Sequence, residues 1–200
     1  DTHADLLRQS AADVGNDRRL GASEAPPVII SIFLGEQLED VVKQLVETGV
    51  ASSAKKGEKL ATGVSTLPDF VKDATDRNRT SPFAFTGNKF EFRTVGSSDS
   101  IASPNTTINA IVAEAFCEAA DRLEKAEDFD MAVHDLIKEY MTKHQRILFS
   151  GNGYSKEWYE EAMRRGLPNI QSTIEAAPTL TTDKAVKLFE NCLLYTSDAA

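Results

Sequence analysis

The amino-acid sequence predicts an α+β fold, in which part of an antiparallel sheet with a β-hairpin packs against several long helices. Three observations support this class. An apolar, β-branched run covers residues 28–34, two aromatic strands flank a turn at residues 86–88, and apolar residues recur at helical spacing from Pro104 onward. With 200 residues, 41% of them hydrophobic, the chain is long enough to bury a sizeable core.

The first half of the chain is expected to begin with a short helix over residues 5–14, which places its leucines on one side. A pair of prolines then stops any helix and leads into the apolar run 28–34, which is typical of a strand or of a buried helix. Residues 36–48 repeat Leu and Val at helical spacing, and Gly49 fits the C-cap of that helix.

An exposed excursion is expected after this helix, because residues 51–66 change to a composition dominated by Ser, Ala, Lys and Gly. We place the whole insertion at about residues 36–75, within a partial domain that covers residues 1–190. Residues 191–200 have no helical period and end in small polar residues, so we expect them to be a non-native tail.

The second half is expected to open with a hairpin, because the aromatic segments 83–85 and 90–93 flank the turn-forming residues 86–88. Helices are then expected over about residues 104–126, 130–143, 155–165 and 182–190. The first of these helices is expected to bury an apolar face made of Ile108, Ile111, Val112, Ala115, Phe116, Ala119 and Leu123.

Charge and composition exclude several classes of function. Lys and Arg number 22 against 31 Asp and Glu, and the resulting net charge of −9 argues against a nucleic-acid binder or a protein of anionic membranes. Cys117 and Cys192 have no paired spacing, so neither a disulfide scaffold nor a cysteine zinc site is expected.

The cellular setting is expected to be the cytoplasm. The longest apolar run is too short to span a bilayer, and no N-terminal signal pattern is present. The chain opens at Asp1 without an initiator Met, which suggests that it starts inside a larger protein.

The sharpest local signal for chemistry is the segment Lys89-Phe90-Glu91-Phe92-Arg93. Because side chains alternate in a strand, the three charged residues are expected on one face and the two Phe rings on the other, turned to the core. A carboxylate between two cations suits a site that holds a metal ion and phosphate. On the pattern alone, a solvated outer face with a weak ion pair is the favoured interpretation.

Two further clusters are polar and charged. Arg77 and Arg79 lie in a loop that enters the hairpin, where arginine can bind phosphate in bidentate geometry. Residues 17–27 combine a glycine, the isolated Glu24 and two prolines, which fits a flap that closes over a site. Taken alone, the arginine loop is better explained as a charged surface loop, and residues 17–27 fit an ordinary helix-to-strand connection equally well.

Taken together and in this order, three segments closely resemble the catalytic domain of glutamine synthetase, and most closely that of the large type III enzymes. The segments are residues 16–27 (Asn-Asp-Arg-Arg-Leu-Gly-Ala-Ser-Glu-Ala-Pro-Pro), 76–85 (Asp-Arg-Asn-Arg-Thr-Ser-Pro-Phe-Ala-Phe) and 87–93 (Gly-Asn-Lys-Phe-Glu-Phe-Arg). The resemblance extends from His3 to about Glu190. It implies that the chain is a C-terminal part of that catalytic domain.

The resemblance implies roles for three residues around the amino-acid substrate. Arg19 matches the arginine that grips glutamate, and Glu24 matches the flap glutamate that closes the site and helps to take a proton from ammonium. Arg93 matches the arginine that stabilises the transferring phosphoryl group and the substrate. One departure is Arg18, which stands where a type III enzyme is expected to carry histidine.

The resemblance also implies residues for nucleotide and metal. Arg79 matches an arginine that contacts nucleotide phosphate, and Lys89 lies where other members carry a phosphate-binding arginine. Glu91 matches a carboxylate ligand of the second divalent metal. The implied cofactors are ATP and Mg²⁺ (or Mn²⁺). With the resemblance, a site for metal and phosphate at residues 89–93 is preferred over a solvated outer face.

The implied reaction is the ATP-dependent ligation of ammonia to the γ-carboxylate of L-glutamate through γ-glutamyl phosphate. The implied partners are L-glutamate, ammonium, ATP and further copies of the chain, because family members assemble into stacked rings. The family's other metal ligands and its ATP-binding loop would precede Asp1, so the isolated piece is expected to be inactive.

Two alternatives to glutamine synthesis stay open. One is a γ-glutamyl-amine ligase of the same superfamily, since the sequence gives no direct indication of the amine. The other is a catalytically dead scaffold or regulatory homologue. The charged residues retained at positions 19, 24, 79, 91 and 93 argue against this second alternative, since a scaffold needs none of them.

Overall fold

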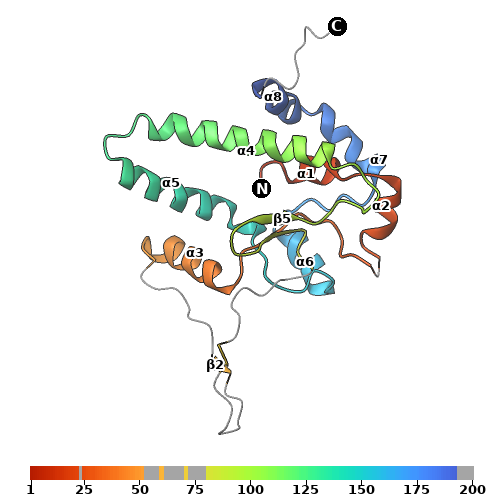
Figure 1. Ribbon diagram of the computed structural model, residues 1–200, viewed down its shortest axis with the longest axis horizontal. Coiled ribbons are helices and arrows are strands. Elements are labelled where there is room, and N and C mark those ends of the chain that lie inside the picture. Colours follow the sequence, from red (N-terminus) through yellow and green to blue (C-terminus); the bar gives the residue numbers. More distant parts are fainter. Residues whose placement is uncertain (23, 52–58, 61–69, 72–79, 193–200) are drawn as a thin grey trace.

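The computed structural model describes residues 1–22, 24–51, 59–60, 70–71 and 80–192. Its helices are α1 (Ala4–Ser10), α2 (Val14–Arg19), α3 (Glu36–Thr48), α4 (Ala102–Leu123), α5 (Phe129–His144), α6 (Lys156–Arg164), α7 (Thr173–Ala176) and α8 (Asp183–Asn191), with 3-10 turns η1 (Gln145–Ile147) and η2 (Ala177–Thr181). Its strands are β1 (Ile32–Phe33), β2 (Lys59–Leu60), β3 (Phe70–Val71), β4 (Phe83–Phe85) and β5 (Phe90–Phe92). The predicted α+β class, with long helices around a small sheet, is confirmed (Figure 1).

The sheet that carries the expected hairpin has the strand order β1-β4-β5. Strands β4 and β5 pair antiparallel across the predicted turn, where Gly87 has a φ of +95° that favours glycine. The expectation of an antiparallel sheet needs one correction, because β1 runs parallel to β4. Parallel neighbours need a long crossover connection, and here the connection contains α3.

The run 28–34, which is apolar except for the buried Ser31, is explained by burial on both sides. Val28 and Ile30 pack in a cluster with Ala4 and Leu7 of α1. Ile29, which points the other way, packs with a second cluster that includes Trp158 of α6. A segment that lies between two cores cannot alternate apolar with polar residues, so its sequence cannot distinguish a strand from a buried helix.

The first expected helix is broken into two. Helix α1 ends at Ser10, and α2 begins at Val14 after Asp13, whose side chain accepts a hydrogen bond from Gly15 N at 2.7 Å. An aspartate in this N-cap position satisfies a backbone donor that a helix start leaves unpaired. The break directs α2 away from α1 and toward the hairpin.

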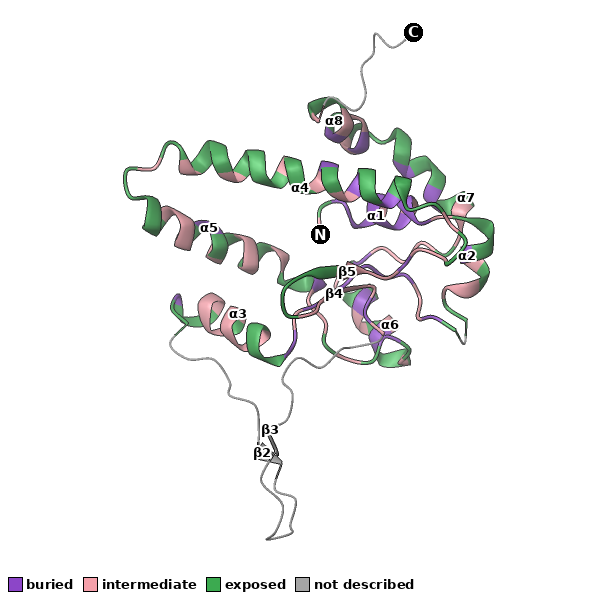
Figure 2. Ribbon diagram, viewed as in Figure 1, coloured by how far each residue is buried: buried purple, intermediate pink, exposed green. Residues whose placement is uncertain are grey.

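Helices α4 and α5 form an arm on one side of the molecule, and the expected buried face of α4 holds only for its first half (Figure 2). Ile108 and Ile111 of the expected face are partly buried against core clusters that contain Ala4 and Leu6 of α1. The fully buried residues of α4 were not on the expected face; they are Pro104, Thr107 and Ala110. Further along the helix the expectation is wrong, because Val112 is 43% exposed and Phe116 is 71% exposed. Helical spacing identifies an apolar stripe but does not say how far along the helix another element covers it.

The expected excursion is described only at β2 and β3, which pair antiparallel, and at α3 before them. Helix α3 ends as predicted at Gly49, which has a left-handed φ of +79°. The predicted phosphate-binding Arg79 lies outside the described residues. Among the helices that are described, none is both long and apolar enough to cross a membrane.

Candidate functional site

Three of the residues singled out from the sequence line one cavity. Arg19 at the end of α2, Glu24 in the following loop and Arg93 just after β5 surround a space of about 120 Å³. Two guanidinium groups and one carboxylate give this lining a net positive charge, which suits an anionic substrate. Ser81, Pro82 and Thr94 complete the wall on the hairpin side.

A buried asparagine positions Arg19. The Asn16 side-chain amide donates to Ala11 O at 2.8 Å and to Thr94 O at 2.9 Å, and its oxygen accepts a hydrogen bond from Arg19 Nε at 3.0 Å. Arg19 Nη2 also donates to Thr94 O, at 2.7 Å. Two of these four bonds join α2 to Thr94, the residue after Arg93, so α2 and the end of β5 are linked beside the cavity.

The loop that carries Glu24, residues 20–27, is closed on itself. Gly21 N donates to Ala25 O at 3.0 Å, and Leu20 and Ala25 form an isolated bridge. Gly21 has a φ of +81°, so a side chain at this position would strain the turn. Glu24 is exposed while Ala25 is buried, which leaves the carboxylate at the open side of the cavity.

The charged face of β5 is formed as predicted. Glu91 accepts hydrogen bonds at Oε2 from Arg93 Nε at 3.1 Å and from Arg93 Nη2 at 2.9 Å, and Lys89 Nζ lies 3.5 Å from Glu91 Oε1. The hydrogen bond from Arg93 holds the pKa of Glu91 below its ordinary value, so this carboxyl is ionised at neutral pH. Next to the cavity, β5 therefore carries a row of paired charges formed by Arg93, Glu91 and Lys89.

The opposite face of β5 corrects one expectation. Phe92 packs against the cluster of Val28 and Ile30, as predicted. Phe90 does not turn to the core, because it is 50% exposed and stacks on Phe83 with 5.4 Å between ring centroids. Alternation placed the two rings on one face correctly but could not show that the core ends before the tip of the hairpin.

The described residues fit one ligand of a divalent metal rather than a whole coordination shell. Glu91 supplies the hard carboxylate oxygen that Mg²⁺ prefers. Within the parts of the chain that the structure describes, no group of three or more His, Cys, Asp and Glu side chains is placed to hold a metal ion. A metal at this position would need further ligands from residues beyond the described ones.

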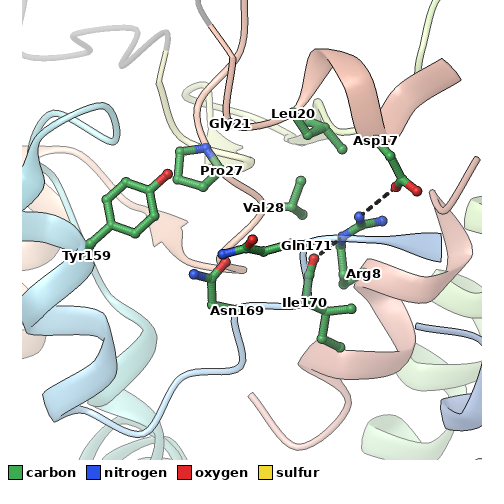
Figure 3. Close-up of a pocket in the computed structure, with 10 residues that line it drawn as sticks. All are labelled: Arg8, Asp17, Leu20, Gly21, Pro27, Val28, Tyr159, Asn169, Ile170 and Gln171. Carbon is green, nitrogen blue, oxygen red and sulfur yellow. Dashed lines mark hydrogen bonds and ion pairs between the residues drawn. The ribbon is translucent and has the colours of Figure 1, made fainter. Parts of the chain in front are cut away.

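A second cavity lies behind the Glu24 loop (Figure 3). It measures about 220 Å³ and shares Leu20, Pro27 and Val28 with the first cavity. In Figure 3 the Tyr159 side chain points toward Pro27 across this space. The loop therefore forms a thin wall between the two cavities.

An ion pair of α1 and α2 lies at the edge of the second cavity. Arg8 is only 1% exposed; its Nη2 donates to Asp17 Oδ1 at 3.0 Å and its Nε to Ile170 O at 2.9 Å. Asp17 Oδ2 accepts a further bond from Thr173 N at 2.6 Å. Because Asp17 lies two residues before Arg19 on α2, these bonds anchor the helix that carries Arg19.

The sequence-predicted site residues thus fall into three groups. Arg19, Glu24 and Arg93 share the cavity; Glu91 joins it through Arg93, and Lys89 lies at the exposed edge. Sequence reasoning missed the supporting roles of Asn16, Thr94 and Asp17 and the cavity wall formed by Tyr154. The contact between Asn16 and Thr94 spans 78 positions, and no local pattern indicates such a pairing.

Comparison with known proteins agrees with the family resemblance of the sequence motifs. Residues 132–199 match the family model described as the glutamine synthetase C-terminal domain. The chain is 47% identical over 192 residues to a type-3 glutamine synthetase of Dictyostelium discoideum, an alignment that covers 94% of this chain and 26% of that protein. It is 45% identical over 189 residues to a glutamine synthetase of Bacteroides fragilis (strain YCH46), covering 90% of this chain and 26% of that protein.

A third relative, a glutamine synthetase of Butyrivibrio fibrisolvens, is 41% identical over 210 residues, which cover 99% of this chain and 28% of the relative. The curated relatives are all glutamine synthetases, and the matched family model is the C-terminal domain of the same enzymes. The chain belongs to the glutamine synthetase family, and its relatives include a type-3 enzyme, as the sequence motifs indicated. It spans about a quarter of the length of the relatives it matches.

Proposed function

We propose that the complete protein carrying this chain is a glutamine synthetase, which joins ammonia to the γ-carboxylate of L-glutamate at the expense of ATP. The observation that carries the proposal is the cavity shared by Arg19, Glu24 and Arg93 in a chain that belongs to this family. Nitrogen assimilation in the cytoplasm is the setting that such an activity implies.

In this proposal the cavity binds the amino-acid substrate. Arg19 binds an anionic group of glutamate. Its hydrogen bonds to Asn16 and Thr94 fix the position of the guanidinium group before the substrate binds. Arg93 neutralises negative charge on the carboxylate during phosphoryl transfer. Glu24 is exposed on a loop, from which it can close the site and take a proton from ammonium.

ATP supplies the phosphoryl group that converts the γ-carboxylate into γ-glutamyl phosphate. Ammonia then forms the carbon–nitrogen bond as phosphate leaves, so that glutamine, ADP and phosphate are the products. Glu91 would provide one oxygen ligand to Mg²⁺ or Mn²⁺, while Lys89 and Arg79 would contact phosphate oxygens. A divalent ion bound there would neutralise charge on the phosphates.

This 200-residue chain alone is proposed to be inactive, because its described residues supply only part of a metal shell. Further copies of the complete protein are the proposed partners, in stacked rings as in the family. Retention of the paired charges Glu91 and Arg93 favours an active enzyme over a scaffold, since an assembly role requires neither.

The test is to measure glutamine and phosphate produced by the complete protein from glutamate, ATP and ammonium. Release of phosphate that depends on both glutamate and ammonium is the expected result. If the protein instead prefers a larger amine to ammonium, it is a γ-glutamyl-amine ligase, and if it forms no amide with any amine, it is a non-catalytic homologue. The same assay on the 200-residue chain should give no product.

A variant of the complete protein tests the metal role of Glu91. Glu91→Gln replaces an anionic ligand by a neutral amide, and even outer-shell partners of a metal cost about 10–100-fold when changed, so turnover should fall at least about a hundredfold. Glu139→Gln is the matched control, because Glu139 also pairs with an arginine but lies on the exposed α5. Equal activity of the two variants would remove Glu91 from the metal site.

A further inference from the structure

The loop between η1 and α6 reaches the substrate cavity. Tyr154 lines the same cavity as Arg19, Glu24 and Arg93, although it lies about sixty positions beyond Arg93 in the sequence. Its side chain is 46% exposed, so the ring lies at the border between the cavity and solvent. The motifs that define the site from the sequence do not include this residue.

A close backbone approach fixes this loop against the hairpin. Gly153 N donates to Thr80 Oγ1 at 2.8 Å, and a Cβ placed on Gly153 would lie 2.8 Å from Thr80 O. A contact this short with a backbone atom excludes any side chain at position 153 without movement of the chain. Thr80 directly precedes Ser81 and Pro82, which line the cavity, so the glycine brings Tyr154 to that wall.

The other side of the loop is anchored as well. Tyr154 N donates to Asn152 Oδ1 at 3.0 Å, and the next residue, Ser155, caps α6 by accepting a hydrogen bond from Trp158 N at 3.1 Å. Trp158 is buried and stacks on Phe149 with 3.7 Å between ring centroids. Tyr154 is therefore held between two fixed points, and its ring is presented to the cavity from a rigid base.

We propose that Tyr154 is a specificity-determining residue of the active site, whose ring narrows the mouth of the cavity against water and against amines larger than ammonia. The inference rests on the proposed function. An acyl phosphate is open to attack by any nucleophile that reaches it, so a bulky apolar ring at the entrance protects the intermediate. The ring also limits the space beside Glu24, where the incoming amine loses its proton.

The experiment compares variants of the complete protein in two ratios: glutamine formed per phosphate released, and kcat/KM for methylamine relative to ammonium. Tyr154→Ala should release phosphate without a matching amount of amide and should raise the relative use of methylamine about tenfold, the size that one methylene is worth in a pocket. Tyr154→Phe keeps the ring and should keep the wild-type amine preference. Gly153→Ala, which displaces the loop, should change both ratios in the same direction as Tyr154→Ala.

Phe116→Ala is the matched control, because it removes an aromatic ring that is 71% exposed on the arm and is not part of the cavity lining. It should leave both ratios at the wild-type values. An active wild-type protein whose Tyr154→Ala variant keeps both ratios would overturn the inference and leave the proposed function intact. A wild-type protein that makes no glutamine would overturn both.

Discussion

The region around the site and the α4–α5 arm differ in the side chains that they bury and expose: polar side chains are buried around the site, whereas apolar side chains are exposed on the arm. Around the site, Arg8, Asn16 and Thr94 are buried, and hydrogen bonds join Arg8 to Ile170 and Asn16 to Thr94 across distant parts of the chain. On the arm, Val112 and Phe116 are exposed, and the ion pair of Arg122 with Glu139 lies at the surface (Figure 2). Burying polar groups is costly, and here Arg8 Nη1 and Thr94 Oγ1 are buried without a hydrogen-bond partner among the described residues, so the site region keeps polar side chains inside at an energetic cost that the arm avoids.

The largest effect expected from this contrast is the loss of the Arg8 side chain. Arg8→Met keeps most of the volume but leaves the Asp17 carboxylate without its cation. Breaking a fully buried pair typically costs about 3–5 kcal/mol, and we expect a loss below that range because the Asp17 side chain is 18% exposed. Urea unfolding of wild type and variant measures the difference. A loss below about 1 kcal/mol, the value of a surface pair, would mean that water replaces the guanidinium and that this region is not specially fixed.

The second expected effect is a pH dependence that the two regions do not share. Burial alone would raise the pKa of Asp17, but hydrogen bonds from Thr173 and Arg8 outweigh it and hold the pKa below its ordinary value. The unfolded chain therefore binds a proton more readily than the folded chain. The stability contributed by Asp17 is complete above its unfolded pKa of about 3.9 and is lost as the pH falls through the lowered pKa.

Asp17→Asn tests this linkage, since the variant has no proton to bind at that position. The interval from pH 5 to pH 2 includes the ordinary carboxyl pKa of about 4. Over this interval the free energy of unfolding should fall less for the variant than for the wild type. Glu139→Gln is the control on the arm: Arg122 lowers the pKa of Glu139 too, but that pair is exposed and screened by solvent. Parallel stability curves for wild type and Asp17→Asn would contradict the prediction.

The same contrast separates what could be predicted from the sequence and what could not. The hairpin, the helix ending at Gly49 and the shared face of Lys89, Glu91 and Arg93 follow from local alternation and turn chemistry, and the structure has them. The gathering of Arg19, Glu24 and Arg93 in one cavity came from family resemblance, because no local rule relates positions so far apart.

What sequence reasoning missed depends on neighbours that are remote in the chain. The apolar stripe of α4 was predicted to be buried as far as Leu123, yet Val112 and Phe116 are exposed beyond the part of the helix that packs on α1 and α8. The role of Gly153 was missed because a Gly-rich turn looks the same whether or not another backbone approaches it at 2.8 Å. Periodicity reports the side on which a residue lies; it does not report what packs there.

The smallest effect is expected on the arm, and it completes the comparison. Arg122 donates to both oxygens of Glu139, at 3.2 and 2.7 Å, which is closer to ideal geometry than the single bond from Arg8 to Asp17. Exposed pairs nevertheless contribute only about 0.2–1 kcal/mol, because water and salt screen the charges and two long side chains lose freedom. Arg122→Met should therefore shift the midpoint of urea unfolding much less than Arg8→Met does, and added salt should reduce the shift further. If Arg122→Met instead matched Arg8→Met in the same urea titration, bond geometry rather than burial would determine how much an ion pair stabilises this chain.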